Sequence, residues 1–187
     1  MSEWPLQTER LTIRRGAADD ADAVYDLRTI PEVSTWIPVS AAFPRESFVA
    51  MYRSPERLPL FLVIERDGEL VGELLLRVDD SYAQVEVREQ GAGTMAEIGW
   101  VIHPDHQRQG YASEAVRRLL AHCFEDLGLH RVVAEAFAGN EATAGLAPKL
   151  GFRLEATHVQ AARHRTLGWV DTVTYALLAE EWAAQRL

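Results

Sequence analysis

The chain has 187 residues, of which 48% are hydrophobic and 25% are charged, and its formal net charge is −9. This size suits one domain with a substantial core, and the acidic balance argues against general nucleic-acid binding, which needs a basic surface. No apolar run reaches the ~20 residues that cross a bilayer, and the N-terminal MSEWPLQTER lacks a signal-peptide pattern. We therefore expect a single cytoplasmic domain over residues 1–187, with no membrane or nucleic-acid partner. The negative charge either attracts a cationic substrate or only aids solubility.

The first third of the chain predicts one strand and two helices. Residues 11–15 alternate apolar and polar side chains, as a half-buried strand does. Asp19 and Asp20 are placed to cap a helix that runs to about residue 28. Pro31 and Pro38 bound a segment that we expect to be irregular, and a second helix is expected over residues 45–53. Aromatic side chains in this region are expected to belong to the core, with a binding surface as the alternative: Trp36, Phe43, Phe48 and Tyr52.

A β-hairpin is predicted next, in LFLVIERDGELVGELLLRVD. The Asp67-Gly68 pair between two β-rich runs is a strong signal for a tight turn, because glycine tolerates a positive φ. Gly72 indicates a bulge or a close backbone approach. The alternation of Val85 and Val87 with charged residues predicts an extended edge, followed by a turn over residues 90–93.

The centre of the chain predicts a strand, a polar loop and a long helix. Residues 96–102 are rich in β-favouring apolar side chains, and Pro104 ends the strand. From Gly110 the apolar residues recur at helical spacing as far as Leu127, and Gly128 follows as a left-handed cap. A helix N-terminus with a glycine and Arg108 beside it favours a phosphate or pyrophosphate. The alternative is an ordinary β–α turn.

The remaining chain predicts a strand at residues 131–138, parallel to the central strand because a helix connects them. Asn140 is placed to cap a short helix, which Gly145 and Pro148 weaken. Two further strands, at residues 153–161 and 168–177, precede a terminal helix. The single cysteine, Cys123, lies on the apolar face of the long helix and is expected to be a buried small hydrophobe.

Two sequence blocks resemble a known superfamily. Gln107-x-x-Gly110-x-Ala112, within GWVIHPDHQRQGYASEA, is similar to the signature of the GCN5-related N-acetyltransferases and of their RimJ/RimL-type subgroup. Asn140, Thr143 and the Leu-Gly-Phe ending at Phe152 match a second block. The resemblance implies an α/β fold: a mixed, mostly antiparallel sheet of six to seven strands with a splayed parallel central pair, flanked by helices. It also allows a homodimer, because dimers are frequent in the family.

The resemblance implies acetyl-CoA as co-substrate and an amine as acceptor. The pantetheine arm would bind the backbone of the central strand, and the pyrophosphate would bind the amides that lead into the long helix. The cofactor-binding residues implied in this way are Trp100, Val101, Ile102, His103, Gln107, Arg108, Gln109, Gly110, Tyr111, Ala112, Ser113, Asn140 and Thr143.

Three residues are candidates for the catalytic groups. Glu97 is the expected general base, since a carboxylate flanked by Ala96 and Ile98 would be partly desolvated. The alternative is a strand glutamate that reaches solvent or pairs with an arginine. Thr143 stands near the expected thioester sulfur, and Tyr175 is a candidate acid for the leaving thiolate, although a tyrosine on a late strand usually packs.

We expect no metal site. His103 and His106 have suggestive spacing, but no third ligand cluster accompanies them and Pro104 prevents a continuous helix. The function expected from the sequence is acetyl transfer to a protein N-terminal amine. Two alternatives stay open: transfer to a small-molecule amine such as an aminoglycoside, amino acid or polyamine, and a non-catalytic acyl-CoA-binding or sensing domain.

Overall fold

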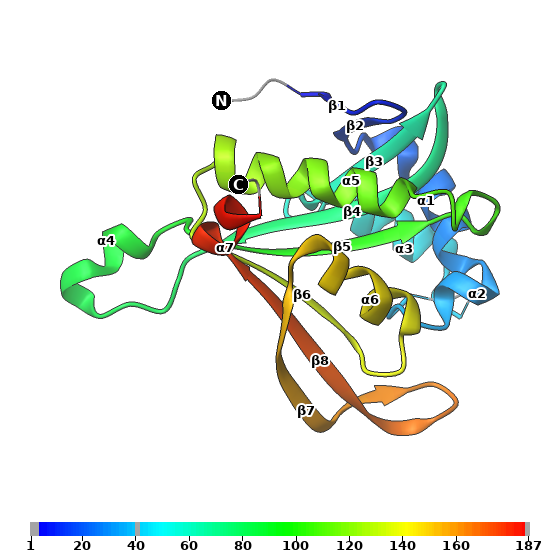
Figure 1. Cartoon of the computed structure of the whole chain (residues 1–187). Coiled ribbons are helices and arrows are strands. Elements are labelled where there is room, and N and C mark those ends of the chain that lie inside the picture. Colours follow the sequence, from blue (N-terminus) through cyan, green and yellow to red (C-terminus); the bar gives the residue numbers. More distant parts are fainter. Residues whose placement is uncertain (1–3, 40–41, 186–187) are drawn as a thin grey trace. The chain divides into compact units, whose positions relative to one another are not determined.

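The computed structural model describes residues 4–39 and 42–185. Eight strands form one sheet in the order β1-β2-β3-β4-β5-β6-β8-β7, and helices flank it (Figure 1). Strands β1 to β4 pair antiparallel with their neighbours in that series, as do β6 with β8 and β8 with β7, whereas β5 and β6 pair parallel. This is the mixed α/β architecture expected from the sequence. The additional strand is β1 (Leu6–Gln7), which is too short to produce a recognisable alternation.

The chain divides into two compact units, and β4, β5 and α5 each contribute to both. The first comprises residues up to Leu76 together with Trp100–Leu119. Its elements are β1, β2 (Thr12–Arg15), η1 (Ala18–Asp20), α1 (Ala21–Thr29), α2 (Pro31–Ser34), α3 (Arg45–Tyr52), η2 (Leu58–Leu60), β3 (Phe61–Arg66), most of β4 (Glu69–Asp79), the end of β5 (Met95–Ile102), η4 (Pro104–His106) and most of α5 (Tyr111–Ala121).

An aromatic core holds α1 and α3 against β3. One face of α1 is buried, and the rings of Tyr52 and Phe61 stack with centroids 4.6 Å apart. The other residues of this core are Ala21, Val24, Tyr25 and Phe48. Phe48 and Tyr52 are therefore core residues, whereas Phe43 is exposed. Beneath them Arg28 donates to the buried carboxylate of Glu73 at 2.6 and 2.8 Å.

The second unit comprises Arg77–Gly99 and Leu120–Leu187. Its further elements are η3 (Val85–Val87), α4 (Arg88–Gly91), η5 (His122–Asp126), β6 (Arg131–Phe137), α6 (Glu141–Leu146), η6 (Pro148–Leu150), β7 (Arg153–His164), β8 (Gly168–Leu178) and α7 (Ala179–Ala184). The register of β5 on β6 runs from Met95–Arg131 to Glu97–Val133 only, whereas β6 continues to Phe137 along β8. The parallel pair therefore separates after Glu97, as the resemblance implied.

Several local predictions are confirmed. Asp67 and Gly68 have φ values of 53° and 82° in the turn of the β3–β4 hairpin. A Cβ at Gly72 would lie 2.5 Å from the carbonyl oxygen of Val101, so this glycine permits a close backbone approach. Gly128 has a φ of 67° at the end of the long helix. Cys123 is fully buried, and burial raises the pKa of its thiol to about 12.

Other local predictions are wrong. Residues 85–91 form η3 and α4 in place of an extended edge; Val85 and Val87 are exposed, so their alternation reflects no buried sheet face. Pro31 begins the short helix α2 in a segment expected to be irregular. The Asp20 carboxylate accepts the amide of Ala17 and pairs with Arg14, and makes no side-chain cap to α1. The last turn of the long helix is π-helical, over residues 122–126.

Candidate functional site

The predicted anion loop lies in the first unit, between the end of β5 and α5. The His103 amide donates to the Val71 carbonyl at 2.9 Å, and the Gln107 side chain donates to the Ile102 carbonyl at 3.1 Å. Gln107 therefore fixes the start of the loop to the end of β5. It also occupies the carbonyl of Ile102, one of the three strand residues expected to bind pantetheine.

The backbone of the loop bends sharply before the helix. Arg108 and Gly110 have φ values of 59° and 84°, in the left-handed region that favours glycine. The Gln109 side chain donates to the Asp105 carbonyl at 3.0 Å. Residues 107–110 are exposed, so the loop presents its backbone to solvent. These two left-handed residues change the direction of the chain before α5 begins.

The N-terminus of α5 carries the donors that an anion needs. The first hydrogen bond into the helix runs from the Glu114 amide to the Gly110 carbonyl at 3.0 Å. The amides of Tyr111, Ala112 and Ser113 precede it and lie at the positive end of the helix dipole. This arrangement has the donor set of a phosphate site.

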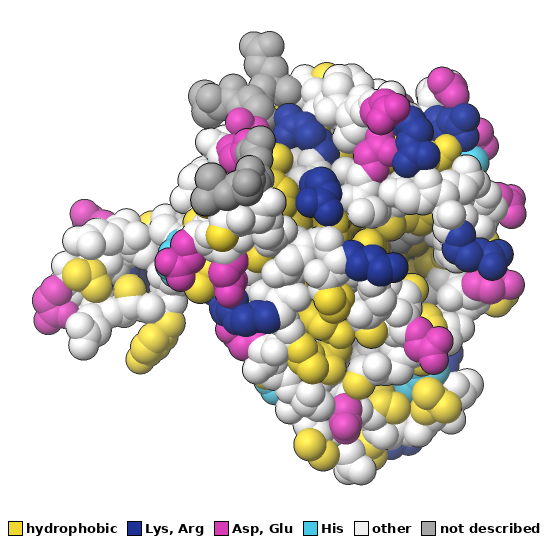
Figure 2. Space-filling model, viewed as in Figure 1, with side chains coloured by type: hydrophobic (Ala, Val, Ile, Leu, Met, Phe, Trp, Pro, Cys, Tyr) yellow, Lys and Arg dark blue, Asp and Glu magenta, His cyan; other side chains and the backbone are white. Residues whose placement is uncertain are grey.

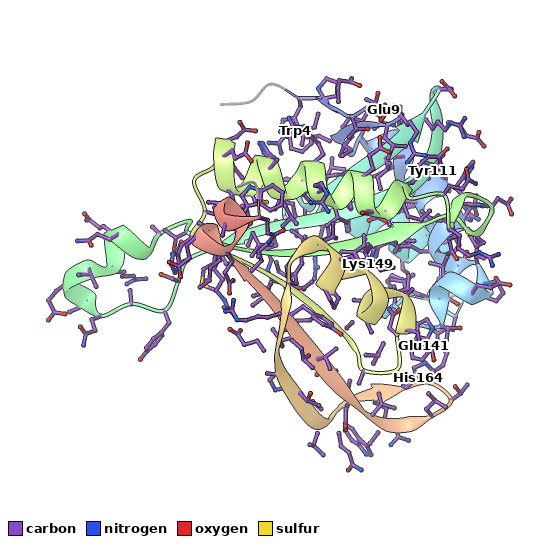
Figure 3. The ribbon with its side chains drawn as sticks, in the orientation of Figure 1. Trp4, Glu9, Tyr111, Glu141, Lys149 and His164 are labelled. Atoms are coloured by element: carbon purple, nitrogen blue, oxygen red, sulfur yellow. The ribbon has the colours of Figure 1, made fainter. Side chains whose placement is uncertain are left out.

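Two arginines beside the loop were not predicted from the sequence. Arg10 donates to the Gln109 carbonyl at 3.0 Å, and its guanidinium carbon lies 4.7 Å from the centroid of the Tyr111 ring. Arg66 donates to the Tyr111 hydroxyl, and its guanidinium carbon lies 5.6 Å from the same ring. Tyr111 begins α5 (Figure 3) and is held between these two cations. No local pattern reveals them, because they come from distant parts of the chain.

Glu114 ties the helix to the start of the chain. Its carboxylate accepts the Thr8 hydroxyl at 2.6 Å, the Arg10 amide at 2.9 Å and the Arg10 guanidinium at 2.6 Å. Burial opposes ionisation of Glu114, but these hydrogen bonds outweigh it and lower the pKa of the carboxyl. The negative charge in the first turn of α5 is therefore matched by Arg10.

Four predicted residues lie in the second unit: Glu97, Asn140, Thr143 and Tyr175. Glu97 pairs with Arg77 at 2.6 Å, and its side chain is 28% exposed. Arg77 also pairs with Asp79 at 2.7 Å, and the hydrogen bond to Asp79, then the charges of Glu97 and Glu135, raise the pKa of Arg77. Glu97 thus belongs to a cluster of three carboxylates around one arginine. With 28% of its side chain exposed, Glu97 is partly desolvated, and its ion pair with Arg77 is the arrangement named as the alternative to a catalytic base.

Asn140 and Thr143 stand together at the start of α6. The Asn140 side-chain oxygen accepts the Thr143 amide at 3.1 Å, which is the capping arrangement predicted as an alternative to cofactor contact. Thr143 is buried. Pro148 does not interrupt α6, because it begins the separate turn η6.

Tyr175 lies on β8 opposite Ala134 of β6 and is buried. This setting fits the packing role that was the alternative to a catalytic one. Within residues 4–39 and 42–185, no group of three or more His, Cys, Asp or Glu side chains is arranged to hold a metal ion. None of the described helices has the length and apolar character required to cross a membrane.

Comparisons with known proteins give the family. The model of the acetyltransferase (GNAT) domain matches residues 10–153. The uncharacterized N-acetyltransferase YnaD of Bacillus subtilis strain 168 is 31% identical over 180 residues, covering 95% of this chain and 98% of the relative. The crystal structure of a GNAT-family acetyltransferase from Bacillus anthracis has a TM-score of 0.76 and 27% identity, covering 94% of this chain and 99% of that one.

Two structures of lower identity share the fold. One is RimL, the ribosomal L7/L12 α-N-protein acetyltransferase in complex with coenzyme A, at 17% identity and a TM-score of 0.76, covering 93% of this chain and 97% of that one. The other is spermidine N-acetyltransferase from Vibrio cholerae in complex with CoA and spermine, at 19% identity and a TM-score of 0.76, covering 94% and 99%. The family model covers most of the chain, which therefore belongs to the acetyltransferase (GNAT) family of acyltransferases.

Proposed function

We propose that the chain is an acetyl-CoA-dependent N-acetyltransferase that moves the acetyl group directly to a primary amine, without an acyl-enzyme. The observation that carries the proposal is the exposed loop at residues 107–110, where two left-handed residues lead into the amides of residues 111–113, which precede the first helical hydrogen bond. Membership of the acetyltransferase family supports the reaction type. On this proposal residues 1–187 act as one acetyltransferase domain in the cytoplasm.

The loop residues fit the anionic part of acetyl-CoA. The amides from Arg108 to Ser113 would receive the pyrophosphate, with Gln109 and Ala112 contributing backbone and the side chain of Arg108 contributing charge. The backbone of Trp100 and Val101, with His103 beyond them, would receive the pantetheine arm. Gln107 would position the loop, since its side chain is engaged with β5.

The proposed chemistry is a single acyl transfer. The amine nitrogen attacks the thioester carbonyl carbon, the carbon–sulfur bond breaks, and the products are an amide and the free thiol of coenzyme A. Glu97 would take the proton from the amine, directly or through water, and Tyr175 would return a proton to the leaving thiolate. Thr143 and Asn140 would line the thioester end. Because Arg77 pairs with Glu97, an incoming ammonium would have to share the Glu97 carboxylate with Arg77 or displace Arg77 from it.

A protein N-terminal amine, as in the RimJ/RimL-type enzymes, is the acceptor we propose first. RimL, named for a protein acceptor, has the same fold. A small-molecule amine is the second candidate, and the carboxylates of Asp79, Glu97 and Glu135 around Arg77 favour it, because they leave a net negative charge that attracts a polyamine.

An amine panel tests the acceptor class. Thiol release from acetyl-CoA, with product mass, is measured for a peptide with a free N-terminus, the same peptide with its N-terminus acetylated, and spermidine. Modification of the free peptide alone supports the first proposal, and modification of spermidine alone supports the second. Equal thiol release with and without any amine would contradict amine transfer.

Glu97→Gln separates an enzyme from an acyl-CoA sensor, with Glu135→Gln as the matched control. If Glu97 is the base, its loss lowers kcat by about 10²–10⁴-fold at unchanged acetyl-CoA affinity. Glu135→Gln removes a charge from the same cluster and changes mainly the acceptor KM. Equal kcat for Glu97→Gln and the parent would remove Glu97 from the mechanism. Acetyl-CoA binding without turnover of any amine by the parent would support the sensing domain.

A further inference from the structure

The start of the chain folds into a tight turn, which we call the N-terminal turn (residues 8–11). The Thr8 amide donates to the Leu11 carbonyl at 2.9 Å, and the Leu11 amide donates back to the Thr8 hydroxyl oxygen at 2.8 Å. Leu6, just before the turn, and Leu11, at its end, are 1% and 2% exposed. The turn is therefore anchored at both ends in the first unit, and Arg10 projects from a fixed support.

The Arg10 guanidinium joins three parts of the entry to α5. Its Nε donates to the Glu114 carboxylate at 2.8 Å, its Nη1 donates to the Gln109 carbonyl at 3.0 Å, and its carbon lies 4.7 Å from the centroid of the Tyr111 ring. Side chains of both charges gather around the β3–β4 turn and the entry to α5 (Figure 2). Because Nε and Nη1 belong to one planar group, the two hydrogen bonds fix the loop relative to the helix.

The hydrogen bond to the Gln109 carbonyl also sets the direction of the next amide. A trans peptide is planar, so the carbonyl of Gln109 and the N–H of Gly110 point in opposite directions. Arg10 holds the carbonyl on its own side, and the Gly110 amide is therefore turned away from Arg10. Glycine allows a wide range of φ, so the bond from Arg10 removes a rotation that this peptide would otherwise have.

We propose that Arg10 is a positioning residue for the anion loop, because it holds the Gln109 carbonyl and the Glu114 carboxylate together and so orients the amides that receive the pyrophosphate. The inference rests on the proposed function, since it concerns the same acetyl-CoA. Nε, Nη1 and Nη2 of Arg10 are all engaged with oxygen atoms of the protein, so Arg10 acts through the loop. The N-terminal turn is thereby part of the cofactor site.

Two substitutions of Arg10 test this role by calorimetric titration with acetyl-CoA. Arg10→Met keeps an unbranched stem and removes the guanidinium. Arg10→Lys keeps the positive charge, but a single ammonium lacks the planar fork that spans the two acceptors. Because both variants lose the bridge between loop and helix, we expect each to weaken acetyl-CoA binding about tenfold.

Arg45→Met is the matched control. The Arg45 guanidinium carbon lies 4.4 Å from the centroid of the Tyr25 ring, and Arg45 pairs with Asp22 and Asp26. Its side chain is 45% exposed, compared with 42% for Arg10. The control therefore removes the same kinds of contact away from α5. We expect it to leave acetyl-CoA affinity unchanged, and thermal unfolding of all three variants shows that each is folded.

S-acetylpantetheine, which lacks the pyrophosphate, separates positioning of the loop from a general loss of structure. Titrated at millimolar concentration, it is expected to bind Arg10→Met and the parent equally. An equal loss of affinity for both donors would overturn the inference, because the effect would not act through the pyrophosphate. Parent-like acetyl-CoA affinity in Arg10→Lys would also overturn it, because charge alone would then suffice.

The parent chain distinguishes failure of this inference from failure of the proposed function. If the parent binds acetyl-CoA and Arg10→Met binds it equally well, the positioning role is overturned and the proposed function stands. If the well-folded parent binds no acetyl-CoA, both are overturned.

Discussion

Replacing Gly110 with alanine tests the anion loop at its most constrained residue. Gly110 has a φ of 84°, and a Cβ there would lie 3.2 Å from the Arg10 Nη2 atom, which must then shift slightly. A left-handed non-glycine residue costs about 1–2 kcal/mol, which the loop either bears or relieves by moving its amides. The methyl group also stands where a phosphate would approach. We expect Gly110→Ala to weaken acetyl-CoA binding about tenfold, the equivalent of about 1.4 kcal/mol.

Gly68→Ala is the matched control. Gly68 has a φ of 82° and no other atom within 4 Å of its added Cβ, so it carries the same backbone cost without a neighbour to disturb. Both variants should lose about 1–2 kcal/mol of unfolding free energy in urea titrations. Only Gly110→Ala should lose affinity in calorimetric titrations with acetyl-CoA. Unchanged affinity in Gly110→Ala, or an equal loss in Gly68→Ala, would refute the assignment of the loop.

Two further predictions concern stability. The Arg131 hydrogen bonds, with those of Arg153, lower the pKa of Glu155 from 4.5 to about 2, so its ion pairs stabilise the fold above the unfolded pKa and are lost as the pH falls through the folded one. The Tm difference between the parent and Glu155→Gln should therefore be full at neutral pH and shrink between about pH 4.5 and pH 2; a constant difference would contradict the assignment. The Tyr52 hydroxyl is buried without a hydrogen-bond partner among the described residues, so Tyr52→Phe should leave the unfolding free energy unchanged or raise it by up to about 1 kcal/mol in urea, and a larger loss would show that the hydroxyl has a favourable role.

The backbone conformation at several glycines could be predicted from the sequence. The Asp67-Gly68 turn, the close approach at Gly72 and the left-handed Gly128 each follow from a glycine that a defined geometry requires. The central strand and long helix follow from apolar periodicity, because their buried faces produce it. The alternation at residues 85–88 led to a wrong strand prediction. Alternation indicates a strand only when one of its faces is buried, and here both valines are exposed.

The contacts that hold the candidate loop could not be predicted from the sequence, because they join residues far apart in the chain. Thr8, Arg10 and Arg66 meet the start of α5 through hydrogen bonds and cation–π contacts that leave no local pattern. The ion pair between Arg77 and Glu97 likewise depends on strand pairing. The sequence therefore predicted that the candidate loop leads into a helix. It did not predict which side chains contact the loop or which charged groups surround Glu97.

The central claim is that this chain binds acetyl-CoA through the loop before α5, and calorimetric titration of the purified protein measures it most directly. Acetyl-CoA is titrated first, with CoA and ATP as controls. We expect saturable binding of acetyl-CoA in the micromolar range that ATP does not reproduce. Acetyl-CoA binding would be contradicted if well-folded protein released no heat with acetyl-CoA and if acetyl-CoA displaced no bound CoA in a parallel assay.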